Sequence, residues 1–254
     1  MDNMRLQLVA NYINAHSYAS FSELCEEFHV SSATMRRDLT KLEQSHQIQR
    51  VHGGAKSILD TLGYEMPLQS RNEQYVQEKL SIANYALSLI KDGESIILDA
   101  STTVLKLAEL ISRSSLNITV ITNFVKIANI LAGLKNIELI LIGGYVRKGS
   151  SSTIGAFAEK MLKEITADKV FLGFDAIDLE KGPINSQIDA IVCKQMAIAN
   201  SKLHIGLCDH SKFTSSAVVQ VCPMSDLDMI ITDTGLSDEI FAGYQQKGIH
   251  IIRA

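Results

Sequence analysis

The chain has 254 residues, of which 46% are hydrophobic and 20% are charged, and its formal net charge at pH 7 is −4. This composition is typical of a globular protein with a sizeable core, and the negative charge argues against a general polyanion binder. No apolar run approaches the ~18 residues that a membrane-spanning helix needs, and the first residues lack the pattern of a secretory signal.

The cysteines are scattered along the chain. They form no C-x-x-C pair and have no histidine pair at metal-ligand spacing. We therefore expect a cytoplasmic protein with free, mostly buried thiols and without a metal or a cofactor. The four residues are Cys25, Cys193, Cys208 and Cys222.

Charge is unevenly distributed near the N-terminus. Residues 1–30 carry one basic side chain and four acidic ones, whereas residues 31–56 carry two acidic side chains and five basic ones: Arg36, Arg37, Lys41, Arg50 and Lys56. A short basic stretch on an acidic protein is typical of a small DNA-binding module. The same stretch also fits an ordinary solvated helix face, in which Arg36 or Arg37 pairs with Asp38 or Glu43.

Apolar spacing predicts three short helices and a hairpin in this region. The helices cover about residues 4–15, 21–28 and 32–45, and Ser20 is a plausible N-cap of the second. Residues 48–55 alternate and end in a Gly-Gly turn, which indicates a hairpin. This is the layout of a winged helix-turn-helix domain over residues 1–56, although the periodicity alone also fits a small protein-binding module.

The third helix is the candidate DNA reader. If Met35, Leu39 and Leu42 face inward, the opposite face presents hydroxyl and basic side chains. Arginine can contact guanine or phosphate in bidentate fashion, and the hairpin can hold the DNA backbone. The expected DNA-binding residues are Ser32, Thr34, Arg36, Arg37, Thr40, Lys41, Arg50 and His52.

A different pattern follows residues 57–75, which read as a linker. Strands are predicted near residues 95–98, 118–122, 138–142, 169–174, 204–208, 229–232 and 249–252. Helices are predicted near residues 77–90, 104–112, 124–133, 156–164, 190–201 and 237–246. This alternation predicts an α/β domain over residues 76–254 with a mainly parallel sheet covered by helices on both faces.

The segment 99–103 lies between a predicted strand and a predicted helix, where open parallel sheets bind ligands. Hydroxyls and free N–H groups at a helix start can hold a phosphate, and Asp99 can accept hydrogen bonds from sugar hydroxyls. Gly143 and Gly144 allow close backbone approach after another strand, while Arg147 or Lys212 can neutralise an anion. Alternatively, the hydroxyls are only a helix cap and the glycines only a tight turn.

Two motifs make the chain resemble the DeoR family of bacterial transcriptional regulators. The family pattern V-S-x-x-T-x-R-R-D-L-x-x-L-E stands at residues 30–43, and the pattern H-G-G-A follows at residues 52–55. The resemblance continues along nearly the whole chain, for example at Thr122-Asn123 and at Asp209-His210-Ser211-Lys212. It implies that residues 32–45 include the recognition helix.

The resemblance also implies that the C-terminal domain is similar to sugar-phosphate isomerases and binds a phosphorylated sugar that controls DNA affinity. The chain is then expected to be a homo-oligomeric regulator, most simply a repressor of carbohydrate genes, that binds operator DNA. The residues expected to bind the effector are Asp99, Ser101, Thr102, Thr103, Thr122, Asn123, Gly143, Gly144, Arg147, Asp175 and Lys212.

Three positions depart from the family pattern. Ser45-His46 stands where a glycine commonly ends the recognition helix, and Ser101 stands where a glycine commonly precedes Thr102-Thr103. Pro183-Ile184-Asn185 replaces a segment that usually carries a threonine. The last two departures leave the identity of the effector open.

A sugar-phosphate enzyme with an appended DNA-binding module is the alternative. Asp175 and Asp178 place two carboxylates near the end of a predicted strand, in a segment that faintly resembles the acidic loop of ribose-phosphate isomerases. Those isomerases place a glutamate base directly before a lysine, whereas Ser211 precedes Lys212 here. We therefore expect no catalytic activity.

Overall fold

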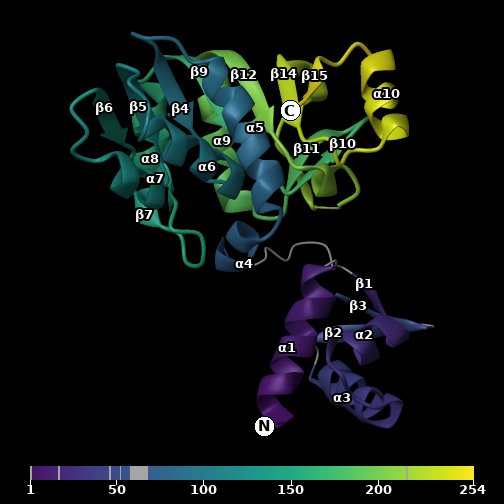
Figure 1. Cartoon of the computed structure of the whole chain (residues 1–254). Coiled ribbons are helices and arrows are strands. Elements are labelled where there is room, and N and C mark those ends of the chain that lie inside the picture. The colour runs from purple at the N-terminus through teal and green to yellow at the C-terminus, as the bar shows by residue number, and fades with distance from the viewer. Residues whose placement is uncertain (1, 17, 46, 52, 58–67, 216) are drawn as a thin grey trace. The chain divides into compact units, whose positions relative to one another are not determined.

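The computed structural model describes every residue except 1, 17, 46, 52, 58–67 and 216. The chain divides into two compact units, an N-terminal unit of residues 1–66 and a C-terminal unit of residues 67–254 (Figure 1). Each unit has its own hydrophobic core.

The N-terminal unit combines three helices with a small antiparallel sheet. The helices are α1 (Asp2–Ala15), α2 (Phe21–Glu27) and α3 (Ser32–Gln44), and the strands are β1 (Tyr18–Ser20), β2 (Ile48–Val51) and β3 (Gly54–Ser57). The predicted helices and hairpin are confirmed, and β1 adds an unpredicted strand, giving the order β1-β3-β2. Three residues are too few to show a period, so β1 could not be predicted from periodicity.

Helix starts and the core follow the expected chemistry. Ser20 caps α2 in a capping box, because its hydroxyl accepts from the Glu23 amide while the Glu23 carboxylate accepts from the Ser20 amide. The predicted inner stripe of α3 is buried at Met35, Leu39 and Leu42. Burial of this stripe fixes which face of α3 is turned to solvent.

An ion pair joins α1 to α3 inside this unit. Asp38 is only 1% exposed, and Arg5 donates to its carboxylate from Nε (2.7 Å) and from an η nitrogen (3.3 Å). A buried carboxylate is tolerated only when it is paired, so this contact holds α3 against α1. Asp38 is therefore not the partner of Arg36 or Arg37.

The C-terminal unit is built on seven parallel strands within the described part of the chain. They are β4 (Ser95–Leu98), β5 (Ile118–Thr122), β6 (Ile137–Leu141), β9 (Ala167–Leu172), β12 (Ser201–Leu207), β14 (Met229–Thr232) and β15 (Ile251–Arg253). Their order is β15-β14-β12-β9-β4-β5-β6. The expected parallel sheet is confirmed.

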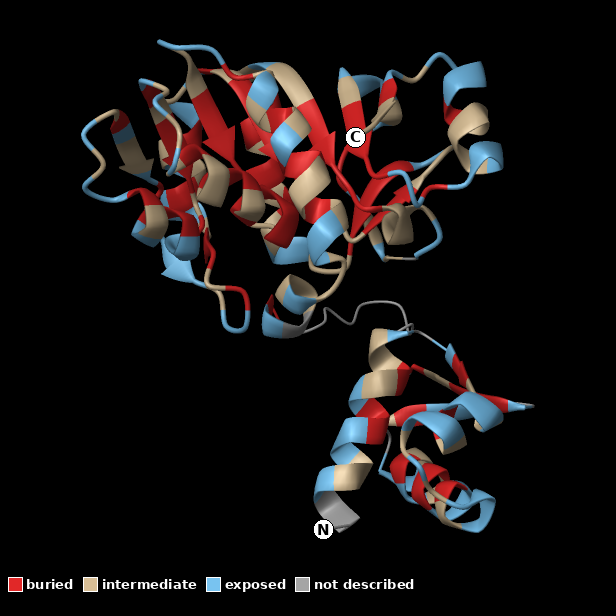
Figure 2. Cartoon of the chain, in the orientation of Figure 1, coloured by how far each residue is buried: buried red, intermediate tan, exposed pale blue. Residues whose placement is uncertain are grey.

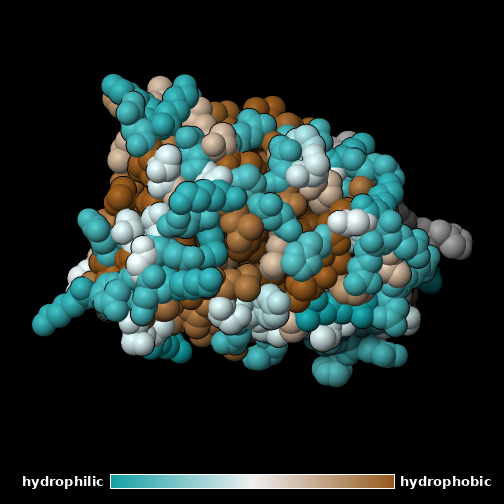
Figure 3. Space-filling view, turned by 90° about the horizontal axis from the view of Figure 1, so that it is seen from above, coloured by the Kyte–Doolittle hydropathy of each residue, from teal (hydrophilic) through white to brown (hydrophobic). Residues whose placement is uncertain are grey.

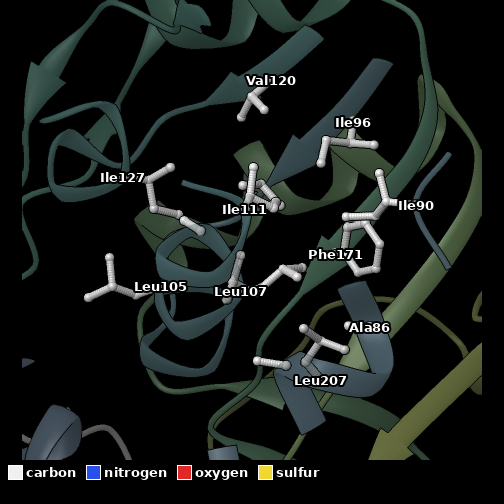
Figure 4. Packing of buried hydrophobic residues seen from close by; sticks show 14 of the residues in the cluster. Ala86, Ile90, Ile96, Leu105, Leu107, Ile111, Val120, Ile127, Phe171 and Leu207 are labelled. Atoms are coloured by element: carbon white, nitrogen blue, oxygen red, sulfur yellow. The ribbon is translucent and has the colours of Figure 1, made fainter. Parts of the chain in front are cut away.

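Helices cover both faces of this sheet, as the strand–helix alternation predicts. One core lies under α5 (Val76–Ser88), α6 (Thr102–Ile111) and α7 (Val125–Leu131), and the other under α8 (Ala156–Lys163), α9 (Ile188–Ala199) and α10 (Asp238–Gln246). Figure 2 shows the buried strands between more exposed helix surfaces, and Figure 4 shows the first core at close range. Aliphatic side chains from helices and strands pack together there, among them Ala86, Leu107, Ile111, Val120 and Leu207.

Two parts of the C-terminal unit differ from the expectation. Residues 68–73, expected in a linker, form helix α4 (Leu68–Glu73), because Leu68 is buried in the core below α5 and α6. A single apolar residue has no period, so the sequence could not show this helix. Ser57 ends strand β3, and residues 58–67 of the expected linker lie outside the described residues.

Several short antiparallel strands were also not predicted from the sequence. They are β7 (Tyr145–Val146), β8 (Thr153–Ile154), β10 (Ala176–Asp178), β11 (Gly182–Asn185) and β13 (Val219–Gln220). Strands β7 and β8 pair with each other, and β11 lies between β10 and β13. These strands follow the main sheet strands β6, β9 and β12 in the chain and surround the ends of the sheet.

The surface of the described residues is mixed in character. Figure 3 shows hydrophobic residues interrupted by hydrophilic ones across the face that it presents. None of the described helices is long and apolar enough to cross a membrane.

The Arg5–Asp38 pair yields a stability prediction. Arg5→Ala leaves the buried Asp38 carboxylate without this partner. Because the Arg5 side chain is 29% exposed, we expect the free energy of unfolding to fall by about 2 kcal/mol, which is less than for a fully buried pair. The loss is measured in the full chain by native-state hydrogen exchange of the α3 amides. Arg113→Ala, an exposed arginine of the C-terminal unit, is the matched control.

A double-mutant cycle isolates the pair. The double variant Arg5→Ala and Asp38→Ala should lose clearly less free energy of unfolding than the two single variants lose together. Strictly additive losses would show that the ion pair does not couple α1 to α3.

Candidate functional site

The outward face of α3 presents basic side chains to solvent. Ser32, Arg36, Arg37 and Lys41 are exposed, and Thr40 is half-buried. Thr34 is also half-buried and belongs to the helix cap, because its amide donates to the hydroxyl of the N-cap Ser31 (3.3 Å).

Neither Arg36 nor Arg37 pairs with the acids that the solvated-face alternative required. Asp38 holds Arg5, and the Glu43 carboxylate accepts from the Arg50 amide (3.2 Å). Within the described residues, both arginines of α3 therefore keep their donors free of carboxylates. This surface is suited to an anionic partner.

Strand β2 adds a further cation beside this face. Arg50 Nη1 donates to the Thr40 hydroxyl (3.2 Å), which itself donates to the Arg36 carbonyl (2.8 Å). The structure thus brings Arg50 of the hairpin and Thr40 of α3 together, as a shared DNA surface requires. His52, also expected there, lies outside the described residues.

In the C-terminal unit, the strand order places a switch point between β4 and β9. The chain continues from β4 to β5 and β6 on one side, and β9 and β12 lie on the other. Because all seven strands are parallel, the loops after them emerge at one edge of the sheet, and the loops after β4 and β9 separate in opposite directions. We call this side of the unit the carboxyl edge.

The loop after β4 is tightly packed at the carboxyl edge. Ser101 caps α6, since its hydroxyl accepts from the Val104 amide (3.1 Å), and Thr102 and Thr103 are 6% and 5% exposed. A Cβ atom at Gly173, in the loop after β9, would lie 2.2 Å from the Ser101 hydroxyl. The serine that departs from the family pattern therefore fits because the facing residue is a glycine.

Asp99 pairs with a buried lysine across the switch point. Lys194 of α9 donates to the Asp99 carboxylate and to the Gly173 carbonyl (2.7 Å), and the Gly173 amide donates to Asp99 (3.1 Å). Both charged side chains are below 10% exposed. Sequence reasoning missed Lys194, although a lysine among Ile191, Ala197 and Ile198 on one helix signals a buried charge.

A second set of charged side chains lies around the loop after β12. Asp209 is fully buried and its Oδ1 accepts from Ser211, while its Oδ2 is buried and has no hydrogen-bond partner among the residues that the structure describes. Lys79 of α5 is 2% exposed and donates to the carbonyls of Arg71 and Gln74.

Burial lowers the pKa of Lys79 to about 8. The Asp209 carboxylate opposes this shift, and nearby cations reinforce it: Lys212, Arg71 and Lys106. Lys79 thus lies close to the Asp209 carboxylate and to other positive charges. The residues expected to bind the effector include Lys212 but not Lys79, Arg71 or Asp209.

Several other expected residues make local contacts around the ends of β5 and β6. The Thr122 hydroxyl donates to the Leu98 carbonyl (2.7 Å), and Asn123 donates to the Thr153 carbonyl (3.0 Å). Gly143 donates from its amide to the Met161 sulfur. At Gly144, whose φ is +149°, a Cβ would lie 2.7 Å from the Ile154 carbonyl oxygen, so only glycine allows this close approach.

These residues also lie far from the loop after β12. Strands β12 and β6 are four strand spacings apart, which is roughly 19 Å at about 4.8 Å per spacing. The two groups of residues therefore lie at different parts of the carboxyl edge. Arg147 lies on the β7 side, where its amide donates to the Ser152 carbonyl (2.8 Å).

The two carboxylates of the enzyme alternative are engaged in local structure. Asp175 accepts from the Ser186 amide (2.9 Å) and from Asn185 (3.3 Å), and Arg71 lies 4.0 Å from it. Backbone hydrogen bonds from Lys181 and Glu180 lower the pKa of Asp178. A carboxylate with a lowered pKa is a weak general base.

The three cysteines of the C-terminal unit are poor nucleophiles in this fold. Cys193, Cys208 and Cys222 are buried. Burial raises the pKa of Cys193 to about 11 and the pKa values of Cys208 and Cys222 to about 12. No cluster of three or more metal-ligating side chains occurs among the residues that the structure describes.

Comparison with known proteins covers both units. Residues 5–61 match the family described as DeoR-like helix-turn-helix domain, and residues 74–234 match the DeoR C terminal sensor domain. The chain is 34% identical to the HTH-type transcriptional regulator IolR of Bacillus subtilis (strain 168), over 99% of this chain and 100% of that protein. It is 32% identical to the lactose phosphotransferase system repressor of Staphylococcus epidermidis, over 90% and 91% of the two chains.

Among solved structures, the chain is similar to ribose 5-phosphate isomerase A from Neisseria gonorrhoeae, with 16% identity, coverage of 54% and 53% of the two chains, and a TM-score of 0.39. The matched helix-turn-helix and sensor domains, together with relatives that align over nearly the full length, establish the family. The chain belongs to the DeoR family of transcriptional regulators.

Proposed function

We propose that this regulator represses genes of carbohydrate metabolism and that a phosphorylated sugar, bound at the carboxyl edge of the C-terminal unit, changes its affinity for operator DNA. The protein acts in the cytoplasm as a homo-oligomer, dimer or tetramer, whose two-fold symmetry matches paired operator half-sites. Residues 1–56 bind DNA and residues 76–254 bind the effector and assemble the oligomer.

The observation that carries the effector site is the partnerless oxygen of Asp209. A buried carboxylate oxygen without a hydrogen bond is costly, and a sugar hydroxyl is a suitable donor for it. Lys212 and Lys79, close to the same carboxylate, provide positive charge for a phosphate. Hydroxyl donors and an anionic group on one small molecule describe a sugar phosphate.

The loop after β4 completes this site in the proposal. Helix α6 begins at Thr102, so its first N–H groups and the hydroxyls of Thr102 and Thr103 can hold the phosphate. Asp99 and Asp175 lie in neighbouring loops on either side of the switch point. The expected residues near β5 and β6 then support the β7–β8 hairpin and shape the far wall of the effector site. They are Thr122, Asn123, Gly143, Gly144 and Arg147.

The relatives support carbohydrate as the effector class. One is named for the lactose phosphotransferase system and another is a putative aga operon transcriptional repressor of Escherichia coli O157:H7, 31% identical over 98% of this chain. Their names concern those proteins. For this chain, the proposal of a carbohydrate effector rests on the Asp209 site.

The enzyme alternative has little support from the site, because Asp175 and Asp178 are used as hydrogen-bond acceptors within loops. A turnover assay across pentose and hexose phosphates separates the two functions. Product formation that disappears in Asp175→Asn would establish an enzyme and contradict a purely regulatory protein.

Lys212→Ala is predicted to abolish effector binding while leaving DNA binding intact, because Lys212 lies in the C-terminal unit. A thermal-shift screen of the full chain against phosphorylated sugars finds the ligand, since a ligand at ~100 times its Kd stabilises by about 2.7 kcal/mol. Lys135→Ala, an exposed lysine elsewhere on the unit, should respond like the unaltered protein. A normal shift in Lys212→Ala would contradict the proposed site.

Phosphate binding is predicted to weaken as pH rises through 8. Lys79 has a pKa of about 8, so it is protonated below that pH and loses its charge above it. Calorimetry with the sugar phosphate from the screen should show about tenfold weaker binding at pH 9.5 than at pH 7.5. In Lys79→Met this pH dependence should disappear; its persistence would show that Lys79 does not face the ligand.

A further inference from the structure

The two adjacent arginines of α3 have different surroundings. The Arg36 guanidinium lies over the ring of Phe21, 5.4 Å from the ring centroid. For Arg37, no side-chain hydrogen bond, ion pair or ring contact occurs with any residue that the structure describes. One guanidinium is therefore held by the protein, and the other is free to enter a partner.

Helical geometry separates them further. Buried Met35, Asp38, Leu39 and Leu42 define the inward side of α3. At about 100° per residue, Arg37 points roughly 150° away from the centre of that side, whereas Arg36 points roughly 110° away, on the flank. Figure 1 shows α2 beside α3, and Phe21 begins α2.

The outermost row of α3 consists of residues one turn apart, Ala33, Arg37, Thr40 and Gln44. Ala33 is exposed and small, so the helix start can approach DNA closely. The Thr40 hydroxyl is already bonded to Arg36 and Arg50. Arg37 is therefore the cation in the middle of the outermost row, which is the part of α3 that would enter a DNA groove first.

A recognition helix inserts its outward row toward the base edges, and its flanks face the phosphates of the groove walls. We propose that Arg37 reads a guanine through its O6 and N7 atoms, and that Arg36 contacts a phosphate. The aromatic ring of Phe21 positions Arg36 for that contact. This division of roles rests on the DNA binding proposed above.

The experiment uses the full chain and a pool of randomised double-stranded DNA. Selection with the unaltered protein yields a preferred duplex, and selection is repeated with Arg36→Ala and Arg37→Ala. Affinity for the preferred duplex is then measured over a series of salt concentrations. Lys91→Ala, which removes one exposed positive charge from the C-terminal unit, is the matched control.

Arg37→Ala should lose the preference for guanine at one position of each half-site, and binding of the preferred duplex should weaken by about 5- to 150-fold for each half-site. Arg36→Ala should keep the same preferred sequence, bind all duplexes more weakly, and reduce the salt slope by about 0.9 per half-site. Phe21→Leu, which retains an apolar side chain without the ring, should resemble Arg36→Ala in milder form.

Loss of a base preference in Arg36→Ala, or an unchanged preference in Arg37→Ala, would overturn this division of roles. Failure of the unaltered protein to enrich any sequence would instead contradict the proposed DNA-binding function. If Phe21→Leu binds DNA more weakly and its melting temperature is unchanged, the ring positions Arg36. If Phe21→Leu binds DNA more weakly with a lower melting temperature, while Arg36→Ala has no effect, the proposed role of the ring is overturned.

Discussion

Parallel orientation of the sheet strands is the constraint on which the C-terminal unit depends. It brings the ends of β4, β9 and β12 to one edge, although their following loops are far apart in the sequence. The Asp99–Lys194 pair bridges the switch point, and a buried pair of this kind is stable only while both partners and their hydrogen bonds are in place. The proposed effector site is thus attached to rigid strands, with its polar groups supplied by loops and helix ends.

Much of this arrangement could be predicted from the sequence. Strand–helix alternation is a strong signal, so the parallel sheet and its covering helices were predicted with only small differences at element ends. The inner stripe of α3 was equally clear, because three apolar residues at helical spacing mark one buried face. Helix α4 and the two-residue strands β7, β8 and β13 were missed, since pairing and tertiary packing, which leave no local period, stabilise such short elements.

The charged centre of the C-terminal unit was harder to predict. Lys79, Lys194 and Asp209 are buried, and composition suggests instead that such residues lie on the surface. Their positions on apolar helix stripes and directly after a strand were the available signal. Thr122 and Gly144 were expected to contact the effector, and in the structure the Thr122 hydroxyl also donates to the Leu98 carbonyl and Gly144 allows close backbone packing.

In the proposed function, sugar-phosphate binding at the carboxyl edge and DNA binding by α3 are energetically coupled. Coupling between two sites is reciprocal, and it typically amounts to ~1–3 kcal/mol. The direct measurement is the affinity of the full chain for its selected duplex, with and without a saturating concentration of the sugar phosphate that stabilises it. We predict a change of about 5- to 150-fold, mirrored by an equal change in sugar-phosphate affinity when DNA is present; a bound sugar phosphate that leaves DNA affinity unchanged would contradict this account.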